Sequence, residues 1–500
     1  MLDIFLISGH NSRMRTFVQY SPDQSFILPP SPSDWLPEGH LAYFISDVVS
    51  ELNLSAFFAK YDTVDGRGSP PFHPAMMVNL LVYAYCTGKP SSRKIERATY
   101  EEVPFRVLAA GHHPDHSVIS AFRQRHLREL ADIFGQVLRI AMAAGLVRMG
   151  HVALDGSKVK ANASKHKAMS YERLVQAEQS LTAEVAEMLA AAAAADNAED
   201  QANVPAARGG DVPPELRRRQ GRLEKIRQAK AFLEKKAKDD AAARAAEFDQ
   251  RQAEREAKEA ETGKKSGGRK PGRPDPETAV PEPKAQQNFT DPESRIMVDG
   301  ATKGFDQCYN AQIVVDSDRQ IIIAADVTQQ ANDKLQLVPM VKQAVENTGT
   351  TPQNLSADAG YFSQEALSDP VLADIQTLVP PSRQKHGESC RKATATAPED
   401  SAPQGQAAAE PPTADGATLA RLVDRMRARL ASQAGHAIYR MRKAIVEPVF
   451  GQIKQIRGFR RFSFRGLDAV QAEWRFICAT HNLLKLFRAG VSASKIRQIG

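Results

Sequence analysis

Between residues 34 and 147, apolar side chains recur at steps of three and four, which is the spacing of amphipathic helices. Pro74 suits the first turn of one such helix, and Gly88 followed by Pro90 suits its end. We therefore predict an all-helical region over 34–147, preceded by an N-terminal arm over 1–33. Periodicity alone favours an ordinary helical bundle over a DNA-binding domain of helix-turn-helix type. The clearest segments are HPAMMVNLLVYAYCTG (73–88), SSRKIERATYEE (91–102) and DHSVISAFRQRHLRELADIFGQVLRIAMAAG (115–145).

From residue 151 the pattern changes, and apolar runs bounded by turn residues replace the helical spacing. The run HVAL leads into Asp155-Gly156, which predicts a buried strand followed by its turn. Two further strands, QCYNAQIVVD and RQIIIAADVTQ, are predicted to form a hairpin with its turn at 316–318. A helix at about 333–347, a strand in NLSADAGYFS that ends at Asp358, and a short strand in IQTLVP follow. This order predicts an α/β fold with a mixed sheet of ribonuclease H type.

The sheet segments are interrupted by a long polar insertion. Two stretches within 165–262 have apolar residues at heptad-like spacing, which predicts two long helices packed as a hairpin. Residues 263–290 are rich in Gly, Pro and charge and are expected to be a disordered linker. Residues 386–417 are expected to be a low-complexity loop. The remaining pieces, 148–164, 291–385 and 418–490, would together form the sheet-containing domain.

Composition narrows the function classes only slightly. The 500 residues include 66 Lys plus Arg against 59 Asp plus Glu, a net charge of +7, and the pI is near 9.1, which is weak evidence for a nucleic-acid partner. The four cysteines are scattered without a Cys-x-x-Cys pair, so neither a zinc ribbon nor a disulfide framework is expected. We find no membrane-spanning run, signal peptide or ATP-binding phosphate loop, and we expect a cytoplasmic protein.

Two aspartates stand where a metal-dependent phosphodiester chemistry would need them. Cleaving and joining DNA requires charge stabilisation on the attacking and leaving oxygens, which two divalent ions about 4 Å apart can supply. Mg²⁺ is usually held by a few carboxylates. Asp155 and Asp358 each follow an apolar run and precede small residues, which let a metal ion and a DNA backbone approach. Taken singly, each is also an ordinary turn residue.

Glu447 is the third candidate, and it is the only acid among eight basic residues between Tyr439 and Arg465. A carboxylate inside such a basic run suits an active site beside DNA phosphates. The alternative is a solvated helix in which Lys443 and Glu447 form an i,i+4 pair. Because Pro448 disfavours helix at the residue before it, we expect the helix to kink or restart there, with Glu447 near an N-terminus.

Four motifs together resemble the bacterial insertion-sequence transposases of the DDE class that carry a Tyr-Arg-Glu-Lys signature. They are ALDGSKVKANAS, DPESRIM (291–297), SADAGYFS and YRMRKAIVEPVFGQIK. The segments PFHPAMMVNLLVYAY and PDHSVISAFRQRH resemble the N-terminal domain of the same family. The resemblance covers most of the chain except the insertion and the second loop, and the order of the motifs is more specific than any one of them.

This resemblance implies a ribonuclease H-like catalytic domain, a DNA-binding helical domain, and one or two Mg²⁺ or Mn²⁺ ions, two being expected. It implies that Asp155, Asp358 and Glu447 are the catalytic metal ligands. The accompanying residues implied or expected to contact DNA are Tyr439, Arg442, Lys443, Lys454, Arg457, Arg460 and Arg461. Glu447 and Lys454 keep the family's interval of seven, whereas the family's arginine position, four residues before Glu447, holds Lys443. The sequence leaves open whether Arg442 or Lys443 takes the arginine's part.

The expected function is a DDE transposase that binds the ends of a mobile element, cleaves DNA and transfers the freed 3′-hydroxyl strand to target DNA. Its expected partners are double-stranded DNA and a second copy of the chain in a homodimer, and its expected location is the nucleoid. Two alternatives are a catalytically inactive transposase-derived regulator and a metal-dependent nuclease of the same fold.

Overall fold

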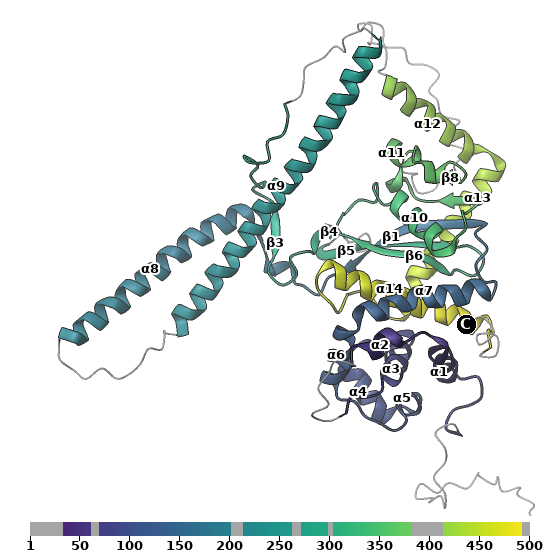
Figure 1. The fold of residues 1–500 in the computed structure, drawn as a ribbon, viewed down its shortest axis with the longest axis horizontal. Coiled ribbons are helices and arrows are strands. Elements are labelled where there is room, and N and C mark those ends of the chain that lie inside the picture. Colours follow the sequence, from purple (N-terminus) through teal and green to yellow (C-terminus); the bar gives the residue numbers. More distant parts are fainter. Residues whose placement is uncertain are drawn as a thin grey trace, which may run out of the picture.

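The structure is a computed structural model (Figure 1). It describes residues 34–61, 70–201, 214–262, 272–298, 304–382 and 414–492. The predicted arm over 1–33 lies outside the described residues. So does nearly all of the predicted loop over 386–417, whose last four residues begin a helix. None of the helices in the described ranges combines the length and the apolar character that crossing a bilayer requires.

The first part of the described chain is all helical, as predicted. Its helices are α1 (Leu41–Glu51), α2 (Ser55–Ala59), α3 (Pro74–Cys86), α4 (Ser92–Glu101), α5 (Val103–Leu108), α6 (His116–Arg125) and α7 (Leu127–Ala143). Pro74 is the first residue of α3, where its missing N–H costs nothing, and Gly88 adopts a left-handed φ of 75° just beyond the end. The third predicted segment holds two helices, separated at the buried His126.

A mixed six-stranded sheet follows. Its strands are β1 (His151–Lys160), β4 (Arg295–Val298), β5 (Phe305–Asp316), β6 (Ile322–Thr328), β7 (Asn354–Ser356) and β8 (Gln376–Leu378). β5 pairs antiparallel with β1 on one side and with β4 and β6 on the other. β1 pairs parallel with β7, and β7 with β8. The predicted hairpin, the helix α10 (Leu337–Thr348) and the short last strand are confirmed.

One detail of the predicted sheet is wrong. We expected β1 to end in a turn at Asp155-Gly156, but β1 continues to Lys160 and pairs with β5 along its whole length from Val152. Gly156 is therefore a strand residue opposite Gln312, and the Asp-Gly pair marks a crowded point in the sheet instead of a turn.

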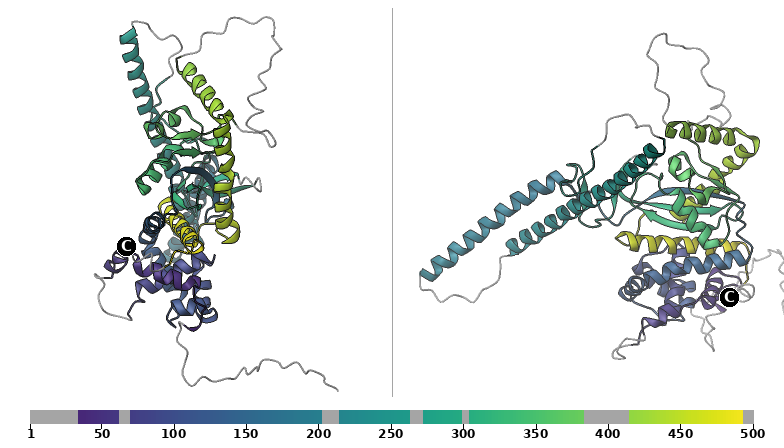
Figure 2. Two further views of the ribbon diagram at one scale, coloured as in Figure 1. Left: turned by 90° about the vertical axis from the view of Figure 1, so that its right-hand side faces the viewer. Right: turned by 45° about the horizontal axis from the view of Figure 1, so that its top comes forward.

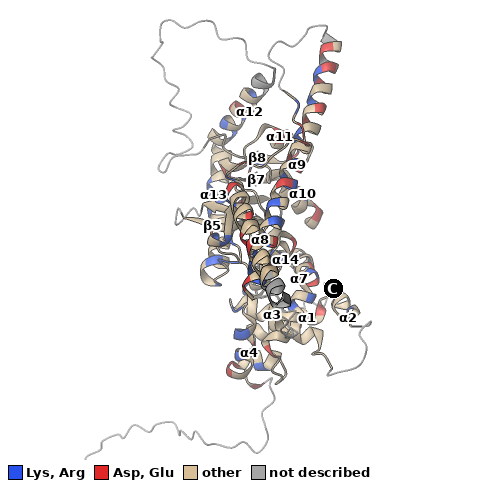
Figure 3. Cartoon of the chain, turned by 90° about the vertical axis from the view of Figure 1, so that its left-hand side faces the viewer, with Lys and Arg blue, Asp and Glu red and all other residues tan. Residues whose placement is uncertain are grey.

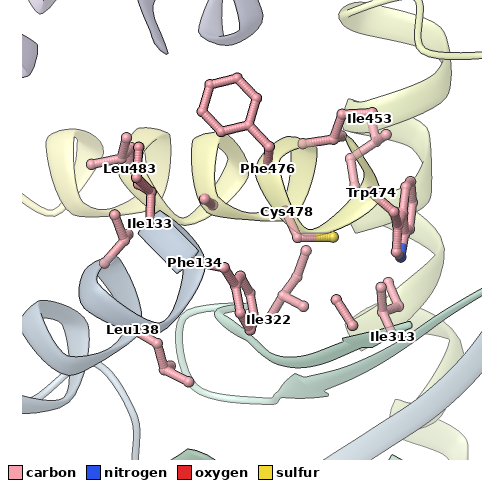
Figure 4. Close-up of a cluster of buried hydrophobic side chains, with 14 of the residues drawn as sticks. Ile133, Phe134, Leu138, Ile313, Ile322, Ile453, Trp474, Phe476, Cys478 and Leu483 are labelled. Atoms are coloured by element: carbon pink, nitrogen blue, oxygen red, sulfur yellow. The ribbon is translucent and has the colours of Figure 1, made fainter. Parts of the chain in front are cut away.

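The helical region and the sheet share one hydrophobic core. Figure 4 shows how α7 and α14 (Leu467–Arg488) pack together against the hairpin of β5 and β6. Buried side chains from each element interdigitate there, among them Phe134 from α7, Trp474 from α14 and Ile322 from β6. Because α7 shares its core with α14 and β6, the helical region is held firmly against the sheet.

Two long helices, α8 (Tyr171–Gln201) and α9 (Pro214–Thr262), extend away from this body (Figure 1 and the right view of Figure 2). They pack along a separate apolar cluster that includes Leu174, Leu223 and Ile226. Next to the start of α8, β2 (Ala168–Ser170) pairs with β3 (Gln286–Asn288) in a small two-stranded sheet. The prediction of a disordered linker over 263–290 is therefore wrong for residues 272–290, which include β3, while 263–271 lie outside the described residues.

The third set of elements consists of α12 (Ala414–Ala431), α13 (Gln433–Gly451) and a π-helical turn over Gln452–Ile456, and α13 packs on β1 and β7. We expected α13 to kink or restart at Pro448, and the restart is wrong, because α13 continues through Pro448 to Gly451. Pro448 cannot donate to the carbonyl of Ala444, and the side-chain amide of Gln320 donates to that carbonyl instead, at 3.0 Å. Glu447 therefore lies near the C-terminal end of α13 and not at a helix N-terminus.

Candidate active site

Asp155 and Asp358 lie level with each other on neighbouring strands. The parallel register of β1 and β7 pairs Ala153 with Ser356, and each aspartate comes two residues later. Asp358 follows the end of β7 and caps a short 3₁₀ helix by accepting a hydrogen bond from the amide of Gly360 at 2.8 Å. The sheet thus brings together two carboxylates that are 203 positions apart in the sequence.

Asp155 is mostly buried, with 21% of its side chain exposed, and it forms an ion pair with Arg442 of α13 at 3.3 Å. Its other carboxylate oxygen accepts a hydrogen bond from the amide of Gly156 at 2.9 Å. Burial, with smaller contributions from the nearby Asp358 and Asp333 carboxylates, raises the pKa of Asp155 to about 6 against the opposing charge of Arg442. Carboxylates crowded in this way are a suitable donor set for a divalent cation.

A third carboxylate near this pair, Asp333, was missed from the sequence. It lies in the loop between β6 and α10 and accepts hydrogen bonds from the amides of Asn310 at 2.6 Å and Gln312 at 2.8 Å. A side chain at Gly156 would meet both Gln312 and Asp333, so this position tolerates nothing larger than glycine without a shift of its neighbours. Asp333 also lies 4.0 Å from the Nζ of Lys158.

The amide of Gln312 links Asp333 to a buried tyrosine. Its nitrogen donates to Asp333, and its oxygen accepts a hydrogen bond from the hydroxyl of Tyr361, which follows Asp358 by three residues. Burial, together with the charges of Asp333, Asp155 and Asp358, holds the pKa of Tyr361 far above its usual value. The hydroxyl of Tyr361 therefore keeps its proton and donates it in a hydrogen bond to the side chain of Gln312.

The structure distinguishes the two candidates for the signature arginine. Arg442 is 8% exposed and points to Asp155, whereas Lys443 is exposed to solvent. The guanidinium of Arg442 also lies 5.9 Å from the ring centre of Tyr439, so these two signature residues are in contact. Arg442 is thus the basic residue that reaches the aspartates.

Lys454, which follows Glu447 in the sequence, contacts β1, the strand that carries Asp155. Its Nζ donates hydrogen bonds to the hydroxyl of Ser157 and to the carbonyl of Lys158, both at 2.9 Å. Glu447 precedes Lys454 by seven residues, and the π-helical turn over Gln452–Ile456 begins between them. The glutamate is exposed, and none of the hydrogen bonds and ion pairs that Asp155 and Asp358 make with described residues involves it.

Of the remaining basic candidates, Arg460 and Arg461 are exposed, and the backbone around them pairs with the end of β1. Arg457 is not available to DNA in this fold, which corrects its predicted role. It is 5% exposed and donates to the hydroxyl of Thr480 at 2.8 Å and to the carbonyl of Ile477 at 3.4 Å. Burial lowers the pKa of Arg457 to about 10, and its backbone packs so closely on Gly88 that a Cβ there would lie 2.6 Å from a carbonyl oxygen.

Comparisons with known families agree with both ends of this description. Residues 30–125 match the family described as Transposase domain (DUF772), and residues 413–487 match the family described as Transposase DDE domain. The second range contains Arg442, Glu447 and Lys454, while both aspartates lie between the two ranges. No curated protein and no solved structure matches the chain. The two family matches support the interpretation of the chain as an insertion-sequence transposase of the DDE class.

Proposed function

We propose that this chain cleaves DNA at the ends of a mobile element and joins the freed 3′-hydroxyl to target DNA, with Asp155, Asp358 and Glu447 as metal ligands. The observation that carries the proposal is the pair of contacts that bracket Glu447. Arg442, before it, contacts Asp155, and Lys454, after it, contacts the hydroxyl of Ser157 on the same strand. A glutamate between two such anchors lies beside the strand that carries the first aspartate.

The sheet supports a ribonuclease H-like catalytic domain. Leaving β4 aside, the order across the sheet is β6, β5, β1, β7 and β8, with the first three strands antiparallel and the last three parallel. This is the mixed order that we expect for that fold, and α13 packs on its two central strands. We expect a glutamate on the packed helix to approach the two aspartates in such a sheet.

Each group in the site has a distinct part in the proposed chemistry. Two Mg²⁺ or Mn²⁺ ions, when bound, would stabilise charge on the attacking and leaving oxygens of the phosphodiester. Asp155 and Asp358 provide ligand oxygens held in place by strand register and by backbone amides. Arg442 offsets the charge of Asp155 and orients its carboxylate. The exposed Lys443, Arg460 and Arg461 neutralise phosphates along the bound duplex.

The helical region over 34–147 is proposed to bind DNA, and the active form is proposed to be a homodimer that pairs two element ends near the nucleoid. A metal-dependent nuclease would use the same three carboxylates but would not join its product to a second DNA. An inactive regulator would bind the ends without cleaving them.

The experiment is a cleavage assay on supercoiled DNA that carries the sequences flanking the reading frame, with Mg²⁺ or with EDTA. We expect Asp155→Asn, Asp358→Asn and Glu447→Gln to abolish metal-dependent nicking while retaining DNA binding. Glu346→Gln, which changes an exposed acid on α10, is the matched control. Nicking at the wild-type rate by any of the three site variants would remove that residue from the ligand set. Joined products would distinguish the transposase from the nuclease.

A further inference from the structure

The insertion carries a basic groove that the proposed chemistry does not use. The groove has a volume of about 810 Å³ and lies between the first turns of α9, the segment that follows β1, and Phe289 and Thr290 after β3. Six of its lining residues are basic or histidine, and none is acidic: His166, Lys167, Arg217, Arg218, Arg222 and Lys225.

The charges on this part of α9 are divided between two faces. On the face that meets α8, basic side chains are paired: Arg219 with Glu184, Arg227 with Glu178 at 3.2 Å, and Lys230 with Glu178 at 2.8 Å. On the face that meets the groove, Arg218, Arg222 and Lys225 are exposed and form no ion pair with any described residue. Their spacing of four and three places them on one side of the helix.

Several charge pairs occur beyond the groove. Further along α9, basic residues again have acidic partners one turn away, as in the pairs Arg251–Glu247 and Arg255–Glu259. Figure 3 shows both signs of charge along this upper part of the helix. Arg218, Arg222 and Lys225 thus form a stripe of exposed basic residues without an acidic partner among the described residues, and all three line the groove.

The groove is connected to the candidate active site by a short length of chain. Lys167 follows Asp155 by twelve residues, which span at most about 40 Å when fully extended. The exposed Arg460, Arg461 and Arg465 lie beside this connection, because the backbone of Arg460 bonds to Lys160 and the side chain of Arg465 to the carbonyl of Asn162. Basic side chains thus continue from the end of β1 to the groove.

We propose that the groove binds the phosphate backbone of duplex DNA on the flank of the cleavage site. From Arg218 to Lys225 the helix rises about 10 Å, a length over which a duplex presents about six phosphates. The 40 Å connection corresponds to about twelve base pairs, so the contacts fall within that distance of the cleaved bond. The proposal rests on the proposed function for the identity of the DNA, and it adds a contact that does not depend on base sequence.

The test is the salt dependence of DNA binding by the full chain in EDTA, with a duplex of the flanking sequence. Each phosphate contact contributes about 0.9 to the slope of log affinity against log salt. We expect Arg218→Gln with Arg222→Gln to lower this slope by nearly two and to weaken binding most at low salt. The matched control, Lys235→Gln with Arg244→Gln, removes two exposed charges further along α9 and should leave the slope unchanged.

Several outcomes would overturn the proposal. Equal slopes for the groove variant and the wild type would exclude phosphate contacts, and equal losses in both variants would indicate only an effect of net charge. Competition by poly-glutamate as effective as that by DNA would indicate an acidic protein partner instead. Metal-dependent nicking is measured separately on the wild type, with Asp155→Asn as the inactive control. If the wild type failed to nick while the groove variant still had the lower salt slope, the proposed function would be refuted. The proposal that the groove binds DNA phosphates would not be affected.

Discussion

Substituting Asp155 should make the metal-free protein more stable, because the folded site favours the neutral form of this side chain. Its pKa rises from the ordinary value of 3.8 to about 6, which means that the folded chain binds the proton more tightly than the unfolded chain does. The stability contributed by this proton is therefore complete below about pH 4 and is lost as the pH rises through about 6. A difference of roughly two pKa units corresponds to about 3 kcal/mol.

Asp155→Asn keeps the shape of the neutral acid but cannot ionise. We expect its free energy of unfolding in EDTA to exceed that of the wild type by up to about 3 kcal/mol at pH 8, and by about half of that at pH 5. The figure is an upper value, because a fifth of the side chain is exposed to solvent. Urea unfolding followed by the fluorescence of the buried Trp474 measures the difference. Asp132→Asn, at an exposed position of α7, is the control.

Divalent cations provide the second half of this test. Mg²⁺ should stabilise the wild type at pH 8, since a bound cation compensates the charge of the crowded carboxylates, and it should stabilise Asp155→Asn less. The difference in the free energy of unfolding between the two proteins should therefore become smaller. A variant that is less stable than the wild type at pH 8 in EDTA would refute the reasoning. It would mean that the ion pair with Arg442 stabilises the charged form more than burial and the neighbouring acids destabilise it.

Two further predictions concern residues outside the site. Gln320→Ala leaves the carbonyl of Ala444 without a donor and should lower the free energy of unfolding by about 1 kcal/mol. Pro448→Ala should restore a backbone donor to this carbonyl, so that Gln320→Ala lowers the stability less in the double variant. Additive free energies of unfolding in this cycle would contradict the compensation. Arg457→Gln should lower the stability by about 1.5–3 kcal/mol while the salt slope of DNA binding stays unchanged, whereas Arg460→Gln should lower the slope by about 0.9 with little effect on stability. A lower slope for the folded Arg457 variant would restore that residue to the DNA-binding surface.

Much of the sheet could be predicted from local pattern, because its strands are short apolar runs between turn residues. The length of β1 could not, since Asp-Gly has the local signature of a turn, and only the pairing with β5 holds it extended. Asp333 was missed for a related reason. It lies five residues beyond the end of β6 and has no flanking motif, and amides on β5 hold it in place.

Arg457 shows what a basic run conceals. Its charge suggested DNA, yet Val446, Phe450, Ile453 and Arg457 follow one another at steps of four, three and four, and all four are buried. The helical period therefore placed position 457 on the buried side, and it was the stronger signal of the two. What the sequence could not provide was the set of acceptors, which come from α3 and α14. A buried guanidinium is stable only where such groups converge, so charge predicts a DNA contact only after the helical face has been assigned.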